Sequence, residues 1–315
     1  MKLVMLDTAT LGEDIDLSPL HVFGEAIEYK TTTPDEIRDR IADADAVMVN
    51  KIKLNADNLP GAKRLRLICV AATGYDNIDT DYCREHGIAV CNVPGYSTDS
   101  VAQLTLSMAL SLVCHLPEYR SFVHNGSYTA SGVANCLTPV YHELSSMTWG
   151  VVGGGGIGRC VAELAEAFGC HVLMCRRQKE NHYEQVDIDT LCQRADIISL
   201  HTPLNESTKG MISRERIASM KRGAVLINVA RGAVTDEEAL ADAILSGHLG
   251  GLGVDVYSKE PFGEEHPFSR ILSCENVCLT PHMAWGSVQA RARCVGVIAD
   301  NIRSFLEGGD KNRKV

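Results

Sequence analysis

Short apolar runs alternate with longer polar stretches along the first third of the chain. The runs are continuously apolar and rich in Val, Ile and Leu, which is the pattern of parallel strands covered on both faces. The polar stretches between them, such as PDEIRDRIADA and IDTDYCREHG, are typical of helices. This order predicts a doubly wound parallel sheet. The predicted strands are 2–7, 46–50, 66–70 and 88–92.

The same alternation starts again at Trp149 and continues to His282. Its clearest helices are IGRCVAELAEAF and TDEEALADAILSG, and the second ends at Gly247, as a helix with a glycine C-cap would. One long helix, predicted from Thr98 to His124, connects the two runs. The predicted strands of the second run are 149–153, 171–175, 197–201, 224–228, 251–256 and 277–280.

A final helix, predicted at 287–306, has no strand after it. We expect it to return and cover the first sheet, which would make the first domain discontinuous. The predicted fold class is therefore α/β, with two doubly wound parallel-sheet domains. We expect one domain at 1–97 plus 286–315 and a second, a Rossmann dinucleotide-binding domain, at 98–285.

The segment WGVVGGGGIG contains one register of the pattern G-x-G-x-x-G, at Gly153, Gly155 and Gly158. In a dinucleotide-binding turn the first glycine lets the chain turn off a strand, and the second lets the backbone approach a pyrophosphate. The third lets the next helix pack closely, with its N-terminal N–H groups facing the phosphates. Four consecutive glycines are also typical of a flexible loop. The strand before them and the helix after them favour the dinucleotide site.

Composition narrows the function classes. The chain has 315 residues, enough for two ordinary domains, and its net charge of −10 disfavours nucleic acid and anionic membranes as main partners. The N-terminus MKLVMLD is too short for a signal-peptide core, and the apolar run 101–116 is too short to span a bilayer. The twelve cysteines are scattered singly, without a C-x-x-C motif. We therefore expect free thiols, no metal site and a reducing, cytoplasmic setting.

Three segments of the second run place polar residues at the C-terminal ends of predicted strands, which is the edge where open α/β sheets bind ligands. They are INVARG with Arg231, GVDVYSKEP with Asp255 and Glu260, and LTPHMAW with His282. Taken singly, each has a simpler explanation: a solvated arginine, a glutamate in a turn beside proline, a structural histidine. Together they bring a cation, a carboxylate and an imidazole to the edge that a nicotinamide ring would reach.

These side chains provide a mechanism for reducing a ketone beside a carboxylate. Arg231 would bind the carboxylate bidentately and polarise the neighbouring carbonyl. His282 would donate a proton to that carbonyl, while Glu260 orients the imidazole and favours its protonated form. A positioned general acid commonly contributes roughly 10²–10⁴ in rate.

Ordered motifs along nearly the full length resemble those of the D-isomer-specific 2-hydroxyacid dehydrogenase family. They are AATGYDNID (71–79), NVPGYSTDSVAQ (92–103), VVGGGGIG (151–158), HTPLNESTKGMI (201–212), NVARG (228–232), DVYSKEP (255–261) and TPHMAW (280–285). The resemblance implies that Arg231, Glu260 and His282 are the catalytic residues. It also implies a discontinuous substrate domain and a homodimer formed through the cofactor domain.

The same resemblance implies ligand-binding positions. Backbone N–H groups of the loop with Thr73 and Gly74 would hold the substrate carboxylate, together with Arg231 and His282. Asp255 would contact the carboxamide of the nicotinamide. The expected cofactor-binding residues are Gly153, Gly155, Gly156, Ile157, Gly158, Arg176, Arg177, Thr202, Pro203, Val229, Ala230, Arg231, Asp255, His282 and Trp285.

The end of the second predicted strand of the Rossmann domain departs from the family's NAD-using pattern. Members that use NAD place an acidic residue there to bind the adenosine ribose, whereas this chain has Arg176 and Arg177. An arginine pair attracts a 2′-phosphate that an acid would repel. The alternative is that these arginines only solubilise the strand end. We predict NADP(H) as the preferred cofactor, with NAD(H) as the alternative.

The motifs TPHMAW and ATGYDNID are most similar to the glycerate dehydrogenase or hydroxypyruvate–glyoxylate reductase branch. Trp285 argues against close kinship with the phosphoglycerate branch, and near 50–52 the sequence has no basic cluster for a phosphate beyond Lys51 and Lys53. We predict a small 2-keto acid as substrate, with Asn50 and Lys51 near its side chain. The alternatives are a D-lactate- or phosphoglycerate-type dehydrogenase that uses NAD, and a non-catalytic dinucleotide-sensing protein of the corepressor type.

Overall fold

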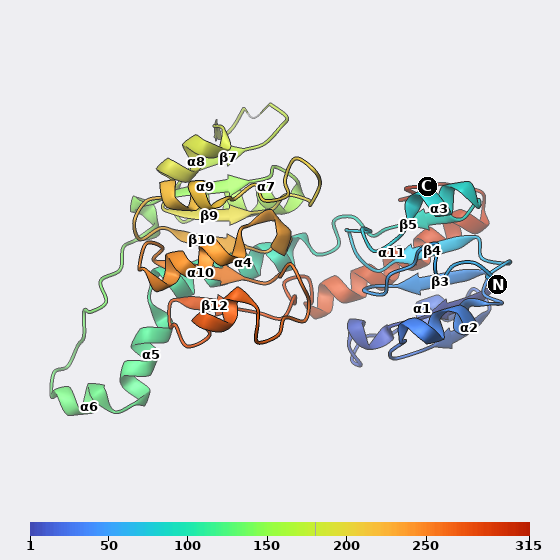
Figure 1. Cartoon of the computed structure of the whole chain (residues 1–315), viewed down its shortest axis with the longest axis horizontal. Coiled ribbons are helices and arrows are strands. Elements are labelled where there is room, and N and C mark those ends of the chain that lie inside the picture. Colours follow the sequence, from blue (N-terminus) through green and yellow to red (C-terminus); the bar gives the residue numbers. More distant parts are fainter. Residues whose placement is uncertain (180) are drawn as a thin grey trace. The chain divides into compact units, whose positions relative to one another are not determined.

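A computed structural model describes residues 1–179 and 181–315 of the chain. Each of its two compact units contains a parallel β-sheet with helices packed on both faces (Figure 1). The predicted α/β class with two doubly wound sheets is therefore confirmed. The apolar strand runs explain this arrangement, because only helices on both faces can remove them from water.

The first unit consists of Met1–Ser97 and Trp285–Val315, and the second consists of Thr98–Ala284. The chain passes from the second unit back to the first near Trp285. The sequence predicts this boundary between residues 285 and 286, and the structure places it one residue earlier. Trp285 thus belongs to the first unit.

Within the described residues, the first unit has a five-stranded sheet in the order β2-β1-β3-β4-β5. Helices α1 (Ser18–His21) and α11 (Val288–Leu306) contribute to the buried cluster on one face, and α2 (Ile37–Ile41) and α3 (Thr80–Glu85) contribute to the cluster on the other. The strands are β1 Lys2–Met5, β2 Glu25–Glu28, β3 Ala46–Val49, β4 Leu67–Val70 and β5 Ala89–Cys91, with 3-10 helices η1 Thr8–Leu11 and η2 Pro34–Glu36.

In the part of the chain that the structure describes, seven parallel strands form the second sheet, in the order β12-β11-β10-β9-β6-β7-β8. From β6 the chain builds outward in one direction through β7 and β8, then returns to the other side of β6 at β9. The switch point of this Rossmann-type order therefore lies between β6 and β9, where such sheets bind dinucleotides. The strands are β6 Thr148–Val152, β7 His171–Cys175, β8 Glu184–Gln185, β9 Ile197–Leu200, β10 Val225–Asn228, β11 Gly251–Val254 and β12 Val277–Leu279.

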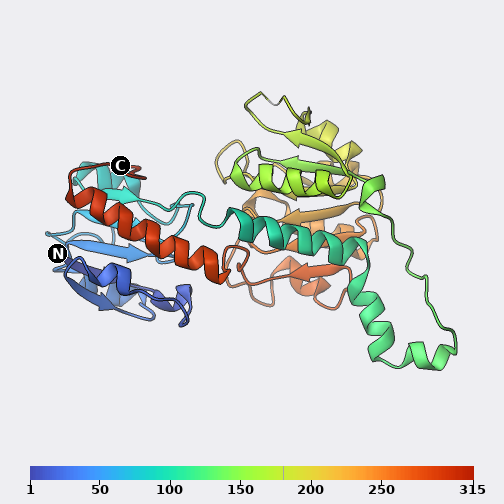
Figure 2. The same cartoon turned by 180° about the vertical axis from the view of Figure 1, so that it is seen from behind.

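Helices cover both faces of this second sheet. Helices α4 (Thr98–Val113) and α7 (Gly156–Ala167) pack against each other on one face, as Figure 2 shows. The opposite face is covered by α8 Ile188–Arg194, α9 Arg214–Ser219 and α10 Glu237–Leu245, with 3-10 helices η4 Gly232–Val234 and η5 Pro267–Ile271. The fully buried Trp149 donates its indole N–H to Ser199 Oγ at 2.9 Å, which joins β6 to β9 at the switch point.

Two strands were not predicted from the sequence. Both are sheet edges: β2 reads EAIE and has no fully buried residue, and β8 consists of two exposed residues. Neither has the continuous apolar run that marks the inner strands. Several predicted strands also end one or two residues earlier in the structure, as in 251–256, where the strand ends at Val254.

The predicted single helix from Thr98 to His124 is wrong. Helix α4 ends at Val113, and α5 (Leu116–His124) continues at an angle of 59°. Between them His115 has a φ of +51°, and Pro117 lies in the first turn of α5. Proline lacks the N–H that a continuous helix needs at this point and clashes with the preceding turn, so the helix must break.

Beyond α5, helix α6 (Ser127–Ser131) and an extended segment lead back to the sheet through η3 (Leu144–Ser146), and they project from the body of the second unit (Figure 1). Among the described residues, every single helix falls short of the length or the apolarity that a membrane span needs. The bent pair α4–α5 meets these criteria when its two helices are taken together.

Candidate active site

The glycine turn joins β6 to α7 at the switch point. Gly153 has a φ of +105°, which L side chains rarely adopt, and a Cβ there would lie 2.4 Å from the carbonyl oxygen of His201. A Cβ on Gly158 would lie 1.9 Å from the carbonyl oxygen of Gly153. The first and third glycines are therefore required by the tight turn and by the close packing of α7 against it.

The middle of this turn is open. Gly155 is the N-cap of α7, and apart from its two chain neighbours no atom of the described residues lies within 4 Å of a Cβ built on it. Gly156 and Ile157 form the first turn of the helix, whose N–H groups have no partner within the helix. This combination of space, unpaired helical N–H groups and positive helix dipole fits a pyrophosphate.

Two arginines follow the neighbouring strand β7. The Arg176 side chain lies against the glycine turn and donates through Nη2 to Gln178 Oε1 at 2.8 Å. Arg177 donates to Ser207 Oγ at 3.2 Å, in the loop after β9. The second strand of the Rossmann unit thus ends in two cations, at the position where such folds recognise the adenosine ribose.

Other expected cofactor-binding residues lie at the ends of β9 and β10. Thr202 and Pro203 follow β9, and Val229 and Ala230 follow β10. The carbonyl oxygen of Pro203 accepts a hydrogen bond from Thr208 Oγ1 at 2.6 Å, which closes the first of these loops. Since β6, β9 and β10 are neighbours, these loops leave the same edge of the sheet as the glycine turn.

The three expected catalytic residues come from the ends of three adjacent strands. Arg231 follows β10, Glu260 follows β11 and His282 follows β12. The strands are in register, with Asn228 opposite Val254. Parallel strands end at one edge, so the topology brings these separate sequence segments together as predicted.

Glu260 and His282 form a direct hydrogen bond. Glu260 Oε2 lies 2.6 Å from His282 Nδ1, and Glu260 Oε1 accepts from the Tyr257 N–H at 2.9 Å. The two side chains are 32% and 23% exposed, so solvent screens the pair only in part. With Nδ1 bound to Glu260, the ring is held in one orientation.

Asp255 fixes the turn that carries His282. Its carboxylate is 1% exposed and accepts hydrogen bonds from Thr280 Oγ1 at 2.6 Å, from the Met283 N–H at 2.8 Å and from the Ala284 N–H at 2.9 Å. Burial raises the pKa of Asp255, and these hydrogen bonds oppose the shift. The structure therefore shows Asp255 organising residues 280–284, a role not evident from its position in the sequence.

The resulting turn puts His282 at a φ of +52°. A non-glycine residue reaches this left-handed region only when its surroundings hold it there, at a cost of about 1–3 kcal/mol. The Asp255 hydrogen bonds to the next two residues supply that restraint.

Asn228 restrains the loop that carries Arg231 in the same way. Its buried amide accepts from the Ala230 N–H at 3.0 Å and donates to the Arg231 carbonyl oxygen at 2.9 Å. Gly232 then brings this loop against the segment that leads to Glu260. A Cβ on Gly232 would lie 2.1 Å from both the Tyr257 carbonyl carbon and the Ser258 nitrogen, so the two loops touch through their backbones.

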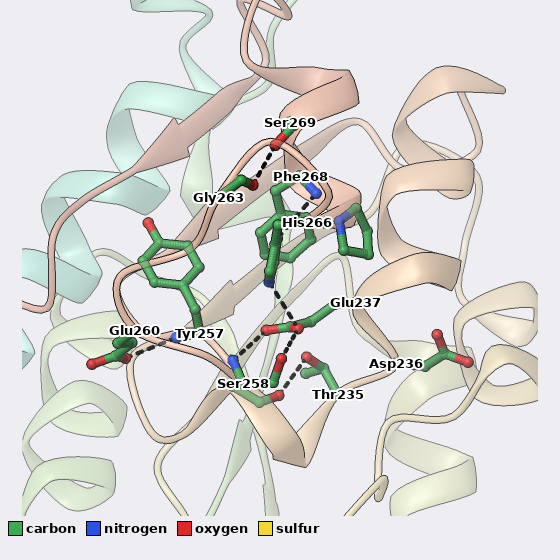
Figure 3. Close-up of polar contacts among 12 residues, drawn as sticks. Thr235, Asp236, Glu237, Tyr257, Ser258, Glu260, Gly263, His266, Phe268 and Ser269 are labelled. Atoms are coloured by element: carbon green, nitrogen blue, oxygen red, sulfur yellow. Dashed lines mark hydrogen bonds and ion pairs between the residues drawn. The ribbon is translucent and has the colours of Figure 1, made fainter.

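A buried network on the other side of that segment was not predicted from the sequence. Glu237, at the N-terminus of α10, accepts from the Ser258 N–H at 2.8 Å, from the Ser258 hydroxyl and from His266 Nε2 at 3.1 Å (Figure 3). The Glu237 and His266 side chains are 8% and 7% exposed. In the sequence TDEEAL, Glu237 and Glu238 are both acids of the kind expected in the first turn of a helix, and the pattern does not distinguish them. Only the folded chain shows which of the two is buried.

The loop of the first unit with the expected carboxylate-binding residues follows β4. Thr73 Oγ1 donates to the Val93 carbonyl oxygen at 2.9 Å, and Asn92 Nδ2 donates to the Thr73 carbonyl oxygen at 2.6 Å. Thr73 is exposed and Gly74 is half-buried. Trp285, also in this unit, packs edge-on against Tyr96 with ring centroids 6.3 Å apart.

Asp7, at the end of β1, organises the neighbouring loop of the first unit. It is 4% exposed and accepts from the backbone N–H groups of Asn50 at 2.9 Å and Lys51 at 2.7 Å. Burial raises its pKa, and the backbone hydrogen bonds oppose that shift. The sequence predicted Asn50 and Lys51 as substrate neighbours but gave no signal for the carboxylate that holds their backbone.

Comparisons with known proteins bear on these features. The sequence profile described as D-isomer specific 2-hydroxyacid dehydrogenase, NAD binding domain, matches residues 106–284. A hydroxypyruvate reductase of Blautia hydrogenotrophica is 33% identical over 321 residues, with 99% of each chain covered.

Solved structures show the same similarity. The D-lactate dehydrogenase of Aquifex aeolicus, in complex with NAD and lactic acid, has a TM-score of 0.85 at 30% identity, covering 98% of this chain and 96% of that chain. An acyclic imino acid reductase in complex with NADPH and D-Arg has a TM-score of 0.86 at 28% identity, covering 100% of both chains.

The Glu237 network yields a prediction for stability. Glu237→Ala removes the acceptor of the Ser258 N–H and hydroxyl and of the buried His266 imidazole, which costs about 2 kcal/mol. We expect the melting temperature of the second unit to fall by roughly 4–8 °C, measured by differential scanning calorimetry. Glu237→Gln, which keeps an acceptor oxygen, should lose less.

Glu238→Ala is the matched control. Glu238 lies next in the same helical turn, is 55% exposed and pairs with Arg270 at 2.7 Å. Removing this exposed pair should change the stability by at most about 1 kcal/mol. Equal melting temperatures for the Glu237→Ala and Glu238→Ala variants would contradict the role given to the buried carboxylate.

Proposed function

Because the chain belongs to the D-isomer-specific 2-hydroxyacid dehydrogenase family, we propose that it reduces a small 2-keto acid to a D-2-hydroxy acid with NADPH. The substrates we propose are hydroxypyruvate and glyoxylate, with D-glycerate and glycolate as products. The observation that carries the proposal is the Glu260–His282 hydrogen bond of 2.6 Å, at the strand edge that also holds Arg231.

The glycine turn supports the cofactor assignment. Gly155 leaves open space at the N-terminus of α7, and Gly153 and Gly158 hold the turn in the close-packed form that such a site needs. Gly155, Gly156 and Ile157 would hold the pyrophosphate through their backbone. When bound, the nicotinamide supplies the hydride for the reduction.

The chain's own residues would then position the keto acid and supply the proton. The Arg231 guanidinium binds the carboxylate and draws electron density from the neighbouring carbonyl. Glu260 holds His282 through Nδ1, so Nε2 is the atom that donates a proton to the carbonyl oxygen as the alcohol forms. We assign a further carboxylate contact to the backbone N–H groups of Thr73 and Gly74.

Two observations support NADP(H) as the preferred cofactor. Arg176 and Arg177 are consecutive cations at the end of β7, and Arg176 is partly buried against the glycine turn. Guanidinium groups bind phosphate oxygens in a fork that a hydrated ribose hydroxyl does not match. A relative of the same fold, the acyclic imino acid reductase, binds NADPH.

The substrate proposal rests on size and on the relatives. The hydroxypyruvate reductase similar over the full length acts on a three-carbon keto acid, as its name states. In this chain Lys51 is held through its backbone by Asp7 at the end of β1. We place Asn50 and Lys51 near the side chain of the substrate. The single positive charge of Lys51 there suits a substrate with a small hydroxyl-bearing group.

A substrate panel assayed with both cofactors tests this proposal. The panel consists of hydroxypyruvate, glyoxylate, pyruvate and 3-phosphohydroxypyruvate, each with NADPH and with NADH. We expect hydroxypyruvate or glyoxylate to give the highest kcat/KM, and NADPH to exceed NADH by about tenfold or more, the value of one good charge-assisted phosphate contact. A higher kcat/KM with NADH would contradict the cofactor assignment. Tight nucleotide binding without oxidation by any keto acid would instead favour a dinucleotide-sensing protein.

We also propose a homodimer formed through the second unit. The segment from α5 to η3 projects from this unit and exposes large apolar side chains, which a monomer would leave in water. Their exposed fractions are Leu116 54%, Val123 55%, Val133 56%, Leu137 74%, Val140 70% and Tyr141 52%. We infer that a second copy of the chain covers this apolar surface.

Light scattering after size exclusion tests the dimer. We expect a mass of twice the 34.2 kDa of one chain. Leu137→Asp combined with Val140→Asp should shift the protein toward the monomer, because charges at an apolar interface core are strongly unfavourable. Leu306→Asp, at the exposed end of α11, is the control and should leave the mass unchanged. A monomeric wild-type chain at micromolar concentration would contradict this assignment.

A further inference from the structure

Gly154 lies within the glycine turn but outside the G-x-G-x-x-G positions. Its φ is outside the left-handed region, so the backbone itself does not require glycine here. A Cβ built on Gly154 would lie 2.6 Å from Arg176 Nε, 2.7 Å from Cδ and 2.9 Å from Cζ. The three nearest atoms all belong to one side chain. The missing Cβ therefore makes room for the Arg176 side chain.

The other glycines of the turn differ in this respect. Gly153 and Gly158 are required by backbone atoms, and a Cβ on Gly156 would meet Thr98 Oγ1 at an ordinary 3.5 Å. A Cβ on Gly154 would instead meet the flexible side chain of Arg176. A side chain at 154 would thus push the guanidinium away while the turn keeps its shape.

The position of Arg176 is otherwise well defined. Its Nε is buried, its Nη2 donates to Gln178 Oε1 at 2.8 Å, and its carbonyl oxygen accepts from Gln185 Nε2 at 2.7 Å. The last of these bonds ties the end of β7 to the edge strand β8. The guanidinium therefore lies across the turn at the strand end where the adenosine ribose is recognised.

We propose that Gly154 is a specificity-determining residue, because it lets Arg176 lie over the turn and bind the 2′-phosphate of NADP(H). This inference rests on the proposed NADP(H) preference and adds the residue that makes it possible. Gly154 acts through Arg176 and is not itself expected to contact the phosphate. A residue with a Cβ at 154 would favour NAD(H), since that cofactor does not need the guanidinium in this place.

Nucleotide dissociation constants test the inference without relying on turnover. The full-length chain and its Gly154→Ala, Gly154→Ser, Arg176→Ala and Gly154→Ala/Arg176→Ala variants are titrated calorimetrically with NADP⁺ and with NAD⁺. We expect Gly154→Ala and Gly154→Ser to raise the Kd for NADP⁺ roughly tenfold, the loss of a charge-assisted contact, while the Kd for NAD⁺ changes less than about threefold. The double variant should lose no more NADP⁺ affinity than Arg176→Ala alone, because both substitutions remove one contact.

Gly156→Ala is the matched control in the same turn. Its Cβ does not meet Arg176, so any effect on the pyrophosphate should change both dissociation constants by the same factor. Retained NAD⁺ affinity in the Gly154 variants shows that the turn is folded.

The outcomes separate this inference from the cofactor assignment. If the wild-type chain does not bind NADP⁺ more tightly than NAD⁺, the NADP(H) preference itself fails. If it does, but Arg176→Ala leaves the ratio of the two dissociation constants unchanged, the role of Arg176, and with it that of Gly154, is refuted. If Arg176→Ala changes the ratio but Gly154→Ala and Gly154→Ser do not, the preference stands and the role of Gly154 is refuted. Equal loss of both nucleotides in the Gly154 variants would also refute it, since that result assigns the glycine to the shape of the turn.

Discussion

Buried polar side chains that bind loop backbone are the constraint on which the candidate active site depends. Asp255 holds residues 280–284, Asn228 holds the turn before Arg231, and Glu237 holds Ser258. Each lies at a strand or helix end. Its side-chain oxygens accept the hydrogen bonds that loop N–H groups would otherwise make to water. These hydrogen bonds restrain the loops that carry Arg231, Glu260 and His282.

This arrangement explains how one sheet edge can orient an imidazole and the carboxylate beside it. The Glu260–His282 contact needs two loops to keep a spacing of 2.6 Å between their side chains. Asp255 restrains the histidine loop, while Tyr257 and Ser258 are held between Glu260 on one side and Glu237 on the other (Figure 3). Preorganisation of this kind is what a general acid requires, because a reacting geometry must exist before the substrate binds. Asp7 provides a comparable restraint in the first unit.

The sequence predicted those features that depend on local pattern. Inner strands were visible as apolar runs, the glycine turn as a strand–glycine–helix order, and the site as polar residues after strands 224–228, 251–256 and 277–280. Edge strands β2 and β8 and the break at His115 do not follow from local pattern, because an edge strand needs no apolar run and the helical pattern continues on both sides of Pro117. Glu237, Asp7 and the packing of Gly154 on Arg176 depend on tertiary neighbours, which spacing along the chain does not encode.

We propose that His282, oriented by Glu260, donates the proton in the reduction of a 2-keto acid. The most direct test is the turnover of His282→Asn with hydroxypyruvate and a saturating nicotinamide cofactor, beside His171→Asn as a control at an exposed histidine of the same unit. We predict that kcat falls about 10²–10⁴-fold in His282→Asn with an unchanged melting temperature, and that His171→Asn behaves like the wild type. Wild-type turnover in His282→Asn would contradict the claim.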